Sequence, residues 1–444
     1  TNLLLAHADA AAPAGDVVTK SLRFNDADNA YLSRTPSTGN RTTWTFSTWV
    51  KRAELGTRQI IFACRYSGNR FYLEFTSGNT IEVSEYGPYT LRLVTNAVYR
   101  DVGSWYHIVF KYDSTPSTPD STSVSLYVNG EQVTSFSTAT YPSQNVTTSI
   151  NAAALHTIGE RADLGGSNYD GYLADVHFID GTALTPTSFA EEDATTGQWK
   201  PKAYDTADGT YGTNGFHLDF EEDSATSGSN AGIGKDVSGK GNYFDTTNLA
   251  ASDVVLDTPT DNFCTFNPLN AYSAIVGMLA EGNLRVTTAT GASGYQMMST
   301  MGVSSGKWYY EYRDDSPPSR NTGVGWVDSK QTPTGSGAGA INQNGAIFYH
   351  DYIYVNGGGA SAGDTLDNGD ICGVALDADV GKIWFSINGT WWDSQDPAAG
   401  SNAKYTASTN SDIWVPSFMD GNYGQGTVNY GQDGTFAGAV TAQG

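Results

Sequence analysis

The sequence predicts an all-β protein of two antiparallel β-sandwiches joined by an acidic, Gly/Ser-rich connector, and three observations lead to this fold class. Glycine numbers 50 and tyrosine 26 among 444 residues, and only 16% of residues are charged, a composition typical of short strands and tight turns. Short runs of β-branched and aromatic residues recur at a spacing of roughly ten residues, which favours sandwiches. The pairs Asn129-Gly130 and Asn388-Gly389 follow such runs and supply the two positive φ angles of a type I′ hairpin turn.

The strand pattern is clearest between residues 306 and 392. The runs there read GKWYYEY, GVGW, GDICGVALD and KIWFSINGTW. In the last run Ile383, Phe385 and Ile387 occupy alternate positions, as in a half-buried strand. These four runs, in this order, resemble a SPRY domain. The resemblance implies a bent antiparallel sandwich over residues 263–437 that binds proteins or glycans through its loops and has no catalytic residues. Residues 438–444 are predicted to be a tail.

A second series of strand-like runs occupies residues 21–190. It reads LRFNDADNAYL, WTFSTWVKR, WYHIVFKYD, VSLYVNGEQV and GYLADVHFIDGTALTP. The series resembles the laminin-G-like, concanavalin-A-like jelly roll, whose members bind glycans or proteins and in a minority of cases are glycosidases. Residues 1–20 are Ala-rich with an apolar start, and two interpretations remain open for them, a flexible arm or an anchor to a larger assembly.

Residues 191–262 contain acidic runs and are dense in Gly, Ser, Asn and Asp. We interpret them as a connector with a few local strands, such as residues 215–220. Part of it is expected to pack on a neighbouring domain, because so long a structureless loop is uncommon. The runs NGFHLDFEEDSA and IGKDVSGKGNYFD resemble the connector that precedes SPRY-like domains in tail-fibre and structural proteins of marine bacteriophages. This resemblance implies a protein of the virion surface.

Charge and cysteine usage exclude several classes of protein. Asp and Glu number 47 against 24 Lys and Arg, for a net charge of −23, so nucleic acid and anionic membranes would repel the chain. No apolar run approaches the ~18 residues that suggest a membrane span. Cys64, Cys264 and Cys372 are odd in number and widely spaced, which indicates neither a disulfide framework nor a zinc motif. We expect all three to be small buried hydrophobes.

Catalysis is not expected. Concanavalin-A-like glycosidases carry paired carboxylates on one strand as Glu-x-Asp-x-x-Glu, and this sequence lacks that pattern. Retaining hydrolysis needs two carboxyl groups ~5–5.5 Å apart. Glu82 and Glu85 would point to opposite faces of a strand. Asp219 and Glu221 would share a face but lie in the predicted connector.

Three aspartates are candidates for a Ca²⁺ site, because Ca²⁺ is bound by carboxylate, amide and carbonyl oxygens. Asp26 and Asp28 lie in the first acidic turn and Asp175 in the closing strand. In the jelly-roll superfamily the first and last strands often pair, which would bring the three together. The alternative is that they are solvated turn residues. His107 and His177 are expected to be packed or surface histidines rather than ligands, and no cofactor is required.

Aromatic residues in loops suggest a glycan-binding surface, since sugar rings stack on Tyr and Trp while Asn and Asp bind the hydroxyls. The alternative is that these aromatics pack under the loops. The candidate ligand-binding residues are Tyr86, Tyr89, Asn168, Tyr169, Asp170, Tyr352 and Tyr354.

Together these observations predict a bacteriophage virion surface protein, of tail-fibre or capsid-fibre type. It would bind a host surface glycan or protein reversibly through loops at the ends of its sandwiches. Its other partners would be virion proteins, with several copies on each particle, so that avidity multiplies weak single sites. Two alternatives remain open: a capsid decoration protein without a host ligand, and a glycosidase.

Overall fold

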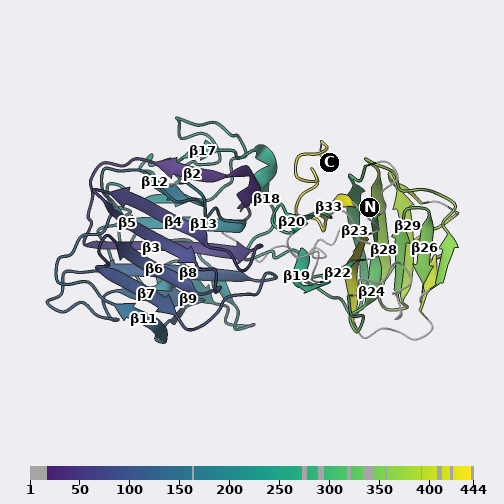
Figure 1. The fold of residues 1–444 in the computed structure, drawn as a ribbon, viewed down its shortest axis with the longest axis horizontal. Helices are drawn as coiled ribbons and strands as arrows, with labels where there is room; N and C mark the ends of the chain where they lie inside the picture. Colours follow the sequence, from purple (N-terminus) through teal and green to yellow (C-terminus); the bar gives the residue numbers. More distant parts are fainter. Residues whose placement is uncertain are drawn as a thin grey trace. The chain divides into compact units, whose positions relative to one another are not determined.

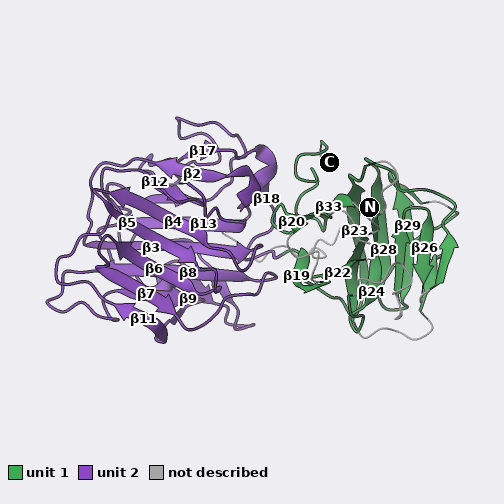
Figure 2. Ribbon diagram, in the orientation of Figure 1, with its two compact units in different colours: residues 1–10, 263–444 green, residues 11–262 purple. Residues whose placement is uncertain are grey.

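The computed structural model describes residues 18–162, 165–272, 278–288, 295–317, 322–333, 345–355, 358–391, 393–407, 413–420 and 424–441. Within these ranges the chain forms β-strands and three short 3₁₀ helices, η1 (Asp26–Asp28), η2 (Pro186–Ser188) and η3 (Ala251–Asp253), so the all-β prediction is confirmed (Figure 1). The chain divides into an N-terminal unit, residues 11–262, and a C-terminal unit, residues 263–444 with 1–10 (Figure 2). Most of the predicted arm, residues 1–17, lies outside the described residues.

The N-terminal unit contains two large antiparallel sheets. Sheet A has the order β10-β9-β8-β3-β13-β1-β18, with β16 also paired to β13. Its strands are β1 (Ser21–Phe24), β3 (Thr43–Arg52), β8 (Trp105–Asp113), β9 (Ser125–Val128), β10 (Glu131–Gln132), β13 (Gly171–Asp180), β16 (Phe216–Leu218) and β18 (Val254–Val255).

Sheet B has the order β11-β7-β6-β5-β4-β12-β2-β17. Its strands are β2 (Tyr31–Arg34), β4 (Gln59–Tyr66), β5 (Asn69–Phe75), β6 (Ile81–Tyr86), β7 (Leu91–Thr95), β11 (Phe136–Thr140), β12 (His156–Ile158) and β17 (Asp245–Thr247). Apolar side chains from the inner faces of both sheets form one core. Phe46 of sheet A stacks on Phe62 of sheet B with ring centroids 4.6 Å apart, so the two sheets form a sandwich.

Residues 191–262 belong to this sandwich rather than to a separate connector. After a short hairpin of β14 (Ala190–Glu192) and β15 (Trp199–Pro201), the segment adds β16 and β18 to sheet A and β17 to sheet B. Its apolar side chains explain why, because Phe216, Leu218 and Phe244 are buried in the common core. The expected packing on a neighbour is therefore strand pairing on both sheets.

A buried ion pair fastens the end of this segment to sheet A. The Lys51 Nζ atom lies 2.7 Å from Oδ2 of Asp257, and both side chains are fully buried. Trp105 Nε1 donates a hydrogen bond to Asp257 Oδ1 at 3.1 Å, and Lys51 also donates to Oδ1 of Asn262 at 2.8 Å. Both partners are thus provided with further polar contacts, as buried charges require.

The C-terminal unit also contains two antiparallel sheets. One has the order β19-β22-β32-β24-β25-β26-β27, with β19 (Phe266–Ala271), β22 (Gln296–Ser299), β24 (Thr322–Asp328), β25 (Gly345–Tyr349), β26 (Tyr352–Val355), β27 (Gly358–Ser361) and β32 (Trp414–Asp420). The other has the order β20-β21-β33-β23-β28-β29-β30, and β31 also pairs with β29. Its strands are β20 (Leu279–Ala280), β21 (Arg285–Thr287), β23 (Lys307–Asp314), β28 (Ile371–Asp377), β29 (Lys382–Ile387), β30 (Thr390–Trp391), β31 (Tyr405–Thr406) and β33 (Gln425–Asn429).

Aromatic contacts join the inner faces of these sheets into a second sandwich. Tyr310 of β23 meets Trp326 of β24 at 5.5 Å, and Phe348 of β25 meets Phe385 of β29 at 5.9 Å. The hairpin prediction is confirmed in both units. Asn129 and Gly130 have φ angles of 50° and 83°, and Asn388 and Gly389 have φ angles of 49° and 76°.

The three cysteines are free and buried, as predicted. Burial raises the pKa of the Cys64 and Cys372 thiols well above the ordinary value, which makes both side chains poor nucleophiles. Among the described residues, no helix is long and apolar enough to cross a membrane.

Candidate functional site

The outer face of sheet B carries a row of charged and aromatic side chains. Along β5, Phe71, Leu73 and Phe75 enter the core, so the residues between them face outward. Strand register then places Tyr72 opposite Ser84 and Glu74 opposite Glu82 of β6. Directly opposite residues share a face of an antiparallel pair, so the two glutamates lie side by side on this outer face.

Arginines bind both glutamates in a forked geometry. Nε of Arg58 lies 2.9 Å from each carboxylate oxygen of Glu74. Arg92 contacts Glu82 through Nε at 3.0 Å and Nη2 at 3.2 Å. Burial raises the pKa of Glu74, and the ion pair with Arg58 opposes that shift only in part. The arginine side chains are partly exposed, so this face presents guanidinium groups above buried carboxylates.

Two exposed tyrosines stand at the end of the same face. Tyr86 and Tyr89 are each 43% exposed, and their rings meet edge-on with centroids 4.8 Å apart. The guanidinium of Arg92 lies 4.8 Å from the Tyr89 ring, and that of Arg70 lies 5.9 Å from the Tyr86 ring. The pair therefore offers apolar ring faces next to hydrogen-bond donors, which is the chemistry expected from the sequence for these two residues.

A polar cleft adjoins this face through Arg58, which belongs to both. The cleft has a volume of about 200 Å³ and is lined by Asp26, Glu54, Thr57, Arg58, Gly166, Ser167 and Asn168. Asn168 is only 8% exposed. Its amide nitrogen donates to Asn29 Oδ1 at 2.7 Å, whereas no described residue donates a hydrogen bond to its Oδ1 atom.

The other predicted residues of this loop are buried. Tyr169 is completely enclosed, and its hydroxyl donates a hydrogen bond to the carbonyl of Lys51 at 2.8 Å. The Tyr169 ring is therefore part of the core and not available for stacking on a sugar, which corrects its prediction as a ligand-binding residue. Asp170 is buried as well. Of Asn168, Tyr169 and Asp170, it is Asn168 that lines the cleft.

The three predicted Ca²⁺ ligands do not form one group. Asp26 and Asp28 lie on η1, just after β1, and Asp26 lines the cleft. The end of β1, Phe24, pairs with Gly171 at the start of β13. Asp175 lies four residues further along β13, a distance of roughly 13 Å at ~3.3 Å per residue. Instead, the Asp175 carboxylate contacts two histidines on the outer face of sheet A, so the prediction of a common site is wrong.

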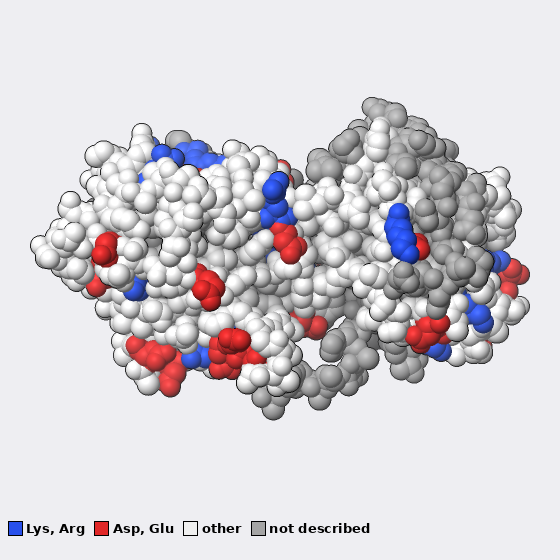
Figure 3. All heavy atoms as spheres, turned by 90° about the horizontal axis from the view of Figure 1, so that it is seen from below, with Lys and Arg blue, Asp and Glu red and all other residues white. Residues whose placement is uncertain are grey.

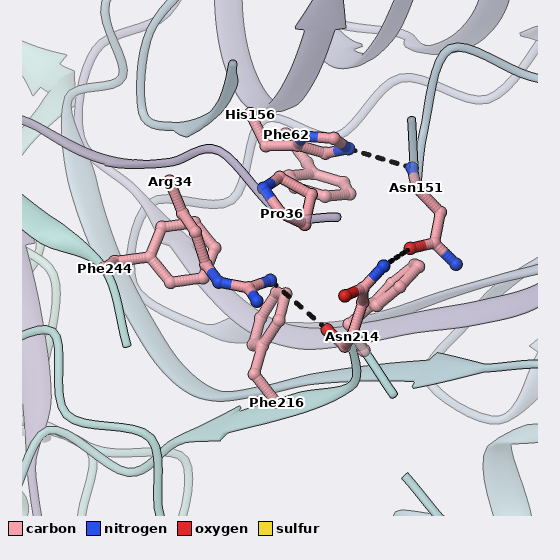
Figure 4. A pocket seen from close by; sticks show the side chains of 9 residues that line it. Arg34, Pro36, Phe62, Asn151, His156, Asn214, Phe216 and Phe244 are labelled. Atoms are coloured by element: carbon pink, nitrogen blue, oxygen red, sulfur yellow. Dashed lines mark hydrogen bonds between the residues drawn. The ribbon is translucent and has the colours of Figure 1, made fainter. Parts of the chain in front are cut away.

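A small cavity lies in the N-terminal unit, between Arg34, His156, Asn151 and Asn214 (Figure 4). Its volume is about 10 Å³, space for one water molecule at most. The backbone N–H of Asn151 donates to His156 Nε2 at 2.9 Å, and the Asn214 side chain donates to Asn151 Oδ1 at 2.7 Å. These polar groups satisfy one another, so the cavity is a structural feature and not a ligand site.

In the C-terminal unit, the two predicted tyrosines lie on β26. Tyr352 is 42% exposed; Tyr354 is half-buried, and its ring lies 5.8 Å from that of Tyr349. Tyr349 and Tyr354 border an apolar cluster that includes Ile347.

Charged groups are scattered on the face that Figure 3 draws. On the face of the described residues drawn in Figure 3, acidic and basic side chains form small separate groups on a mostly uncharged surface. This view shows no broad basic patch of the kind that binds nucleic acid.

Sequence patterns missed Arg58, Glu74 and Arg92 and considered Glu82 only as a catalytic carboxylate with Glu85, although one signal for this site was present. Alternation in the run that forms β5 places Arg70, Tyr72 and Glu74 on one face. The pairing of that strand with β6 was not predictable from local sequence.

Comparison with known proteins agrees with the fold of the N-terminal unit. Residues 25–189 match a family model described as the concanavalin A-like lectin/glucanases superfamily. Solved structures that resemble the chain include a heptameric SAP-like pentraxin from Limulus polyphemus, with 17% identity over 38% of this chain and 79% of that one and a TM-score of 0.30. The SPRY domain of human HERC1 has 16% identity over 37% of this chain and 95% of its own, with a TM-score of 0.27.

The TRIM65 PSpry domain has 17% identity over 38% of this chain and 90% of its own, with a TM-score of 0.28. No curated protein matches the chain. Residues 25–189 are therefore similar to the concanavalin A-like superfamily of lectins and glucanases, and the N-terminal unit has the antiparallel sandwich sheets expected of such a jelly roll.

Proposed function

We propose that the N-terminal unit binds a glycan or a protein on the outer face of sheet B, without catalysis, and that the chain is a bacteriophage surface protein that attaches to host cells. The observation that carries this proposal is the exposed pair Tyr86 and Tyr89, with arginines over both rings. The phage context rests on the resemblance of residues 191–262 to connectors of phage structural proteins. A solvated tyrosine pair beside polar groups suits the alternating apolar and hydroxyl surfaces of a sugar.

The adjoining cleft supports Ca²⁺ as an additional ligand. Asp26 and Glu54 provide carboxylates, and Oδ1 of Asn168 is a nearly buried amide oxygen without a hydrogen-bond donor among the described residues. Hard oxygen atoms of this kind are the ligands that Ca²⁺ takes. When bound, the ion would supply positive charge for hydroxyl or carboxylate groups of a ligand, while Asn168 and Asp26 would hold it.

Replacing both Tyr86 and Tyr89 with alanine should weaken binding to a host glycan by roughly 5- to 150-fold, since two aromatic contacts of ~0.5–1.5 kcal/mol each are lost. A glycan array followed by titration calorimetry, with and without Ca²⁺, measures this. Tyr352→Ala is the matched control, because Tyr352 has nearly the same exposure in the C-terminal unit. Loss of binding with Tyr352→Ala alone would move the site to the C-terminal unit. No binding of the wild-type protein to any glycan or host cell would favour a decoration protein.

A second candidate, a glycosidase, is favoured by one observation: Glu74 and Glu82 are cross-strand neighbours. Their Cβ atoms are expected ~4.5–5.5 Å apart, and retaining enzymes need carboxyl groups at a similar distance. Bidentate arginines occupy both carboxylates, however, which leaves no free acid to protonate a leaving group. We therefore expect no release of reducing sugar from oligosaccharides. Release that Glu74→Gln abolishes would establish the enzyme instead.

A further inference from the structure

Three metal-binding side chains meet on the outer face of sheet A, away from the proposed ligand site on sheet B. Oδ1 of Asp175 lies 2.9 Å from Nε2 of His177 and 2.8 Å from Nε2 of His217. One ligand atom from each of the three lies within 4.8 Å of the others, and theirs is the one such cluster of His, Cys, Asp and Glu among the residues described. His177 and His217 are directly opposite each other in the β13–β16 pair.

A β-bulge in β13 orients the carboxylate. Three steps along β13, from Ala174 to His177, face only two steps along β3, so β13 contains one extra residue. Leu173 and Val176 enter the core while Ala174 packs on the outer side. Asp175 is the extra residue, with a left-handed φ of 51°. Such a conformation costs ~1–3 kcal/mol and occurs where function or surrounding structure requires it. Here it brings the carboxylate to the same face as His177.

The surroundings resemble a metal site in three respects. Asp175 is only 4% exposed, and no described group donates a hydrogen bond to its second oxygen, Oδ2. A buried carboxylate oxygen without a donor is costly unless a cation or water satisfies it. Nδ1 of His177 lies 3.0 Å from the hydroxyl of Tyr211, the type of second contact that orients metal-binding histidines. The side chain of His217 is 23% exposed, which gives an ion a route from solvent.

We infer that Asp175, His177 and His217 bind a divalent transition-metal ion such as Zn²⁺. Two imidazoles and one carboxylate are suitable ligands for Zn²⁺, and a water molecule at the exposed side of His217 would complete a tetrahedron. The ion would join β16 to β13, and so fasten residues 191–262 to the jelly roll.

The present distances are those of hydrogen bonds, and the two imidazole rings stack at 4.0 Å with 20° between their planes. Ligand atoms around a tetrahedral Zn²⁺, at ~2.0–2.2 Å from the ion, are about 3.3 Å apart. Rotation of the His217 ring would lengthen the 2.8 Å contact between His217 Nε2 and Asp175 Oδ1 by the required half ångström or so. The competing explanation is that protons, rather than a metal, hold the three groups together.

The test is Zn²⁺ binding by the full chain after removal of metal with a chelator. Titration against a chromophoric zinc chelator should give one Zn²⁺ per chain, and Zn²⁺ should raise the unfolding temperature. Asp175→Asn and His217→Ala should each abolish stoichiometric binding. Asparagine tolerates the left-handed backbone, so the first variant is expected to fold. Tyr211→Phe should weaken binding ~10–100-fold.

His350→Ala, in the C-terminal unit, is the matched control and should leave the stoichiometry at one. The inference is overturned if the wild-type chain binds no Zn²⁺, or if it binds one that both Asp175→Asn and His217→Ala retain. Either result would assign the three residues to a purely hydrogen-bonded network.

Discussion

Replacing Asp257 with alanine is expected to lower the free energy of unfolding of the N-terminal unit by about 3–5 kcal/mol. Its carboxylate neutralises Lys51 at 2.7 Å, with both side chains fully buried, and accepts a hydrogen bond from Trp105. Removal leaves an ammonium group in the interior with only part of its former contacts. The expected loss of stability is the cost of leaving one buried charge without its partner. This cost is much larger than the net stabilisation that the intact ion pair provides.

The measurement is urea unfolding, with the free energy taken from the midpoint and slope. Glu222→Ala is the matched control, because Glu222 forms an ion pair with Lys235 at 2.6 Å between partly exposed side chains. That change should cost less than ~1 kcal/mol. Equal effects of the two substitutions would mean that Asp257 does not anchor residues 250–262 as described.

The second large effect is a loss of folding stability at acid pH, which we expect from His156. Burial lowers the pKa of His156 from 6.5 to about 4, although the Ala154 carbonyl partly opposes the shift and nearby Arg34 adds to it. The backbone N–H of Asn151 donates to Nε2 of His156, so the neutral ring carries its proton on Nδ1 and donates it to the carbonyl of Ala154 at 2.9 Å. Protonation of Nε2 would break the first of these hydrogen bonds.

The direction in which stability changes with pH follows from which state of the chain binds a proton at His156. Between pH 6.5 and about pH 4 the unfolded chain binds a proton at His156 that the folded chain does not. Stability from this residue is therefore complete above pH 6.5 and falls by ~1.4 kcal/mol per pH unit below it, or about 3 kcal/mol in total. His107, whose pKa burial lowers to about 3, acts in the same direction.

His156→Gln isolates the effect, because the glutamine amide has one acceptor and one donor but does not titrate. Urea unfolding of wild type and variant between pH 7 and pH 4.5 should give slopes that differ by ~1.4 kcal/mol per pH unit. Parallel pH profiles, with or without a constant offset between wild type and variant, would report only altered packing and would contradict the assignment of the pH dependence to His156.

Local patterns predicted the strands and turns whose signal lies within one run of residues. The alternation in Lys382–Ile387 became β29, and both Asn-Gly pairs adopt positive φ. Within residues 191–262 the sequence predicted a strand at residues 215–220, which contains β16, whereas β17 and β18 were missed because they are only two or three residues long and pair with partners far away in the sequence. Composition there is typical of loops, and the few core side chains among many polar ones do not form a periodic pattern.

The candidate site residues likewise fall into those that local sequence predicts and those that depend on contacts with distant parts of the chain. Exposure of Tyr86 and Tyr89 agrees with their turn-rich sequence, and ligand binding by them stays a prediction. Tyr169 has equally loop-like neighbours, yet its hydroxyl reaches a buried carbonyl and draws the ring inward. The contact of Asp175 with His217 depends on a bulge and on the pairing of β13 with β16. Neither is encoded in short-range spacing.

Strand β1 pairs with β18, and β2 with β17, across more than two hundred intervening residues. During synthesis, therefore, one edge of each sheet of the jelly roll lacks its last strand, β18 or β17, until residues 245–255 have left the ribosome. Folds dominated by such distant pairings assemble slowly, and open strand edges attract other chains meanwhile. A nascent chain of this protein would pass through a prolonged stage of exposed edges, for which chaperone protection during translation is a natural requirement.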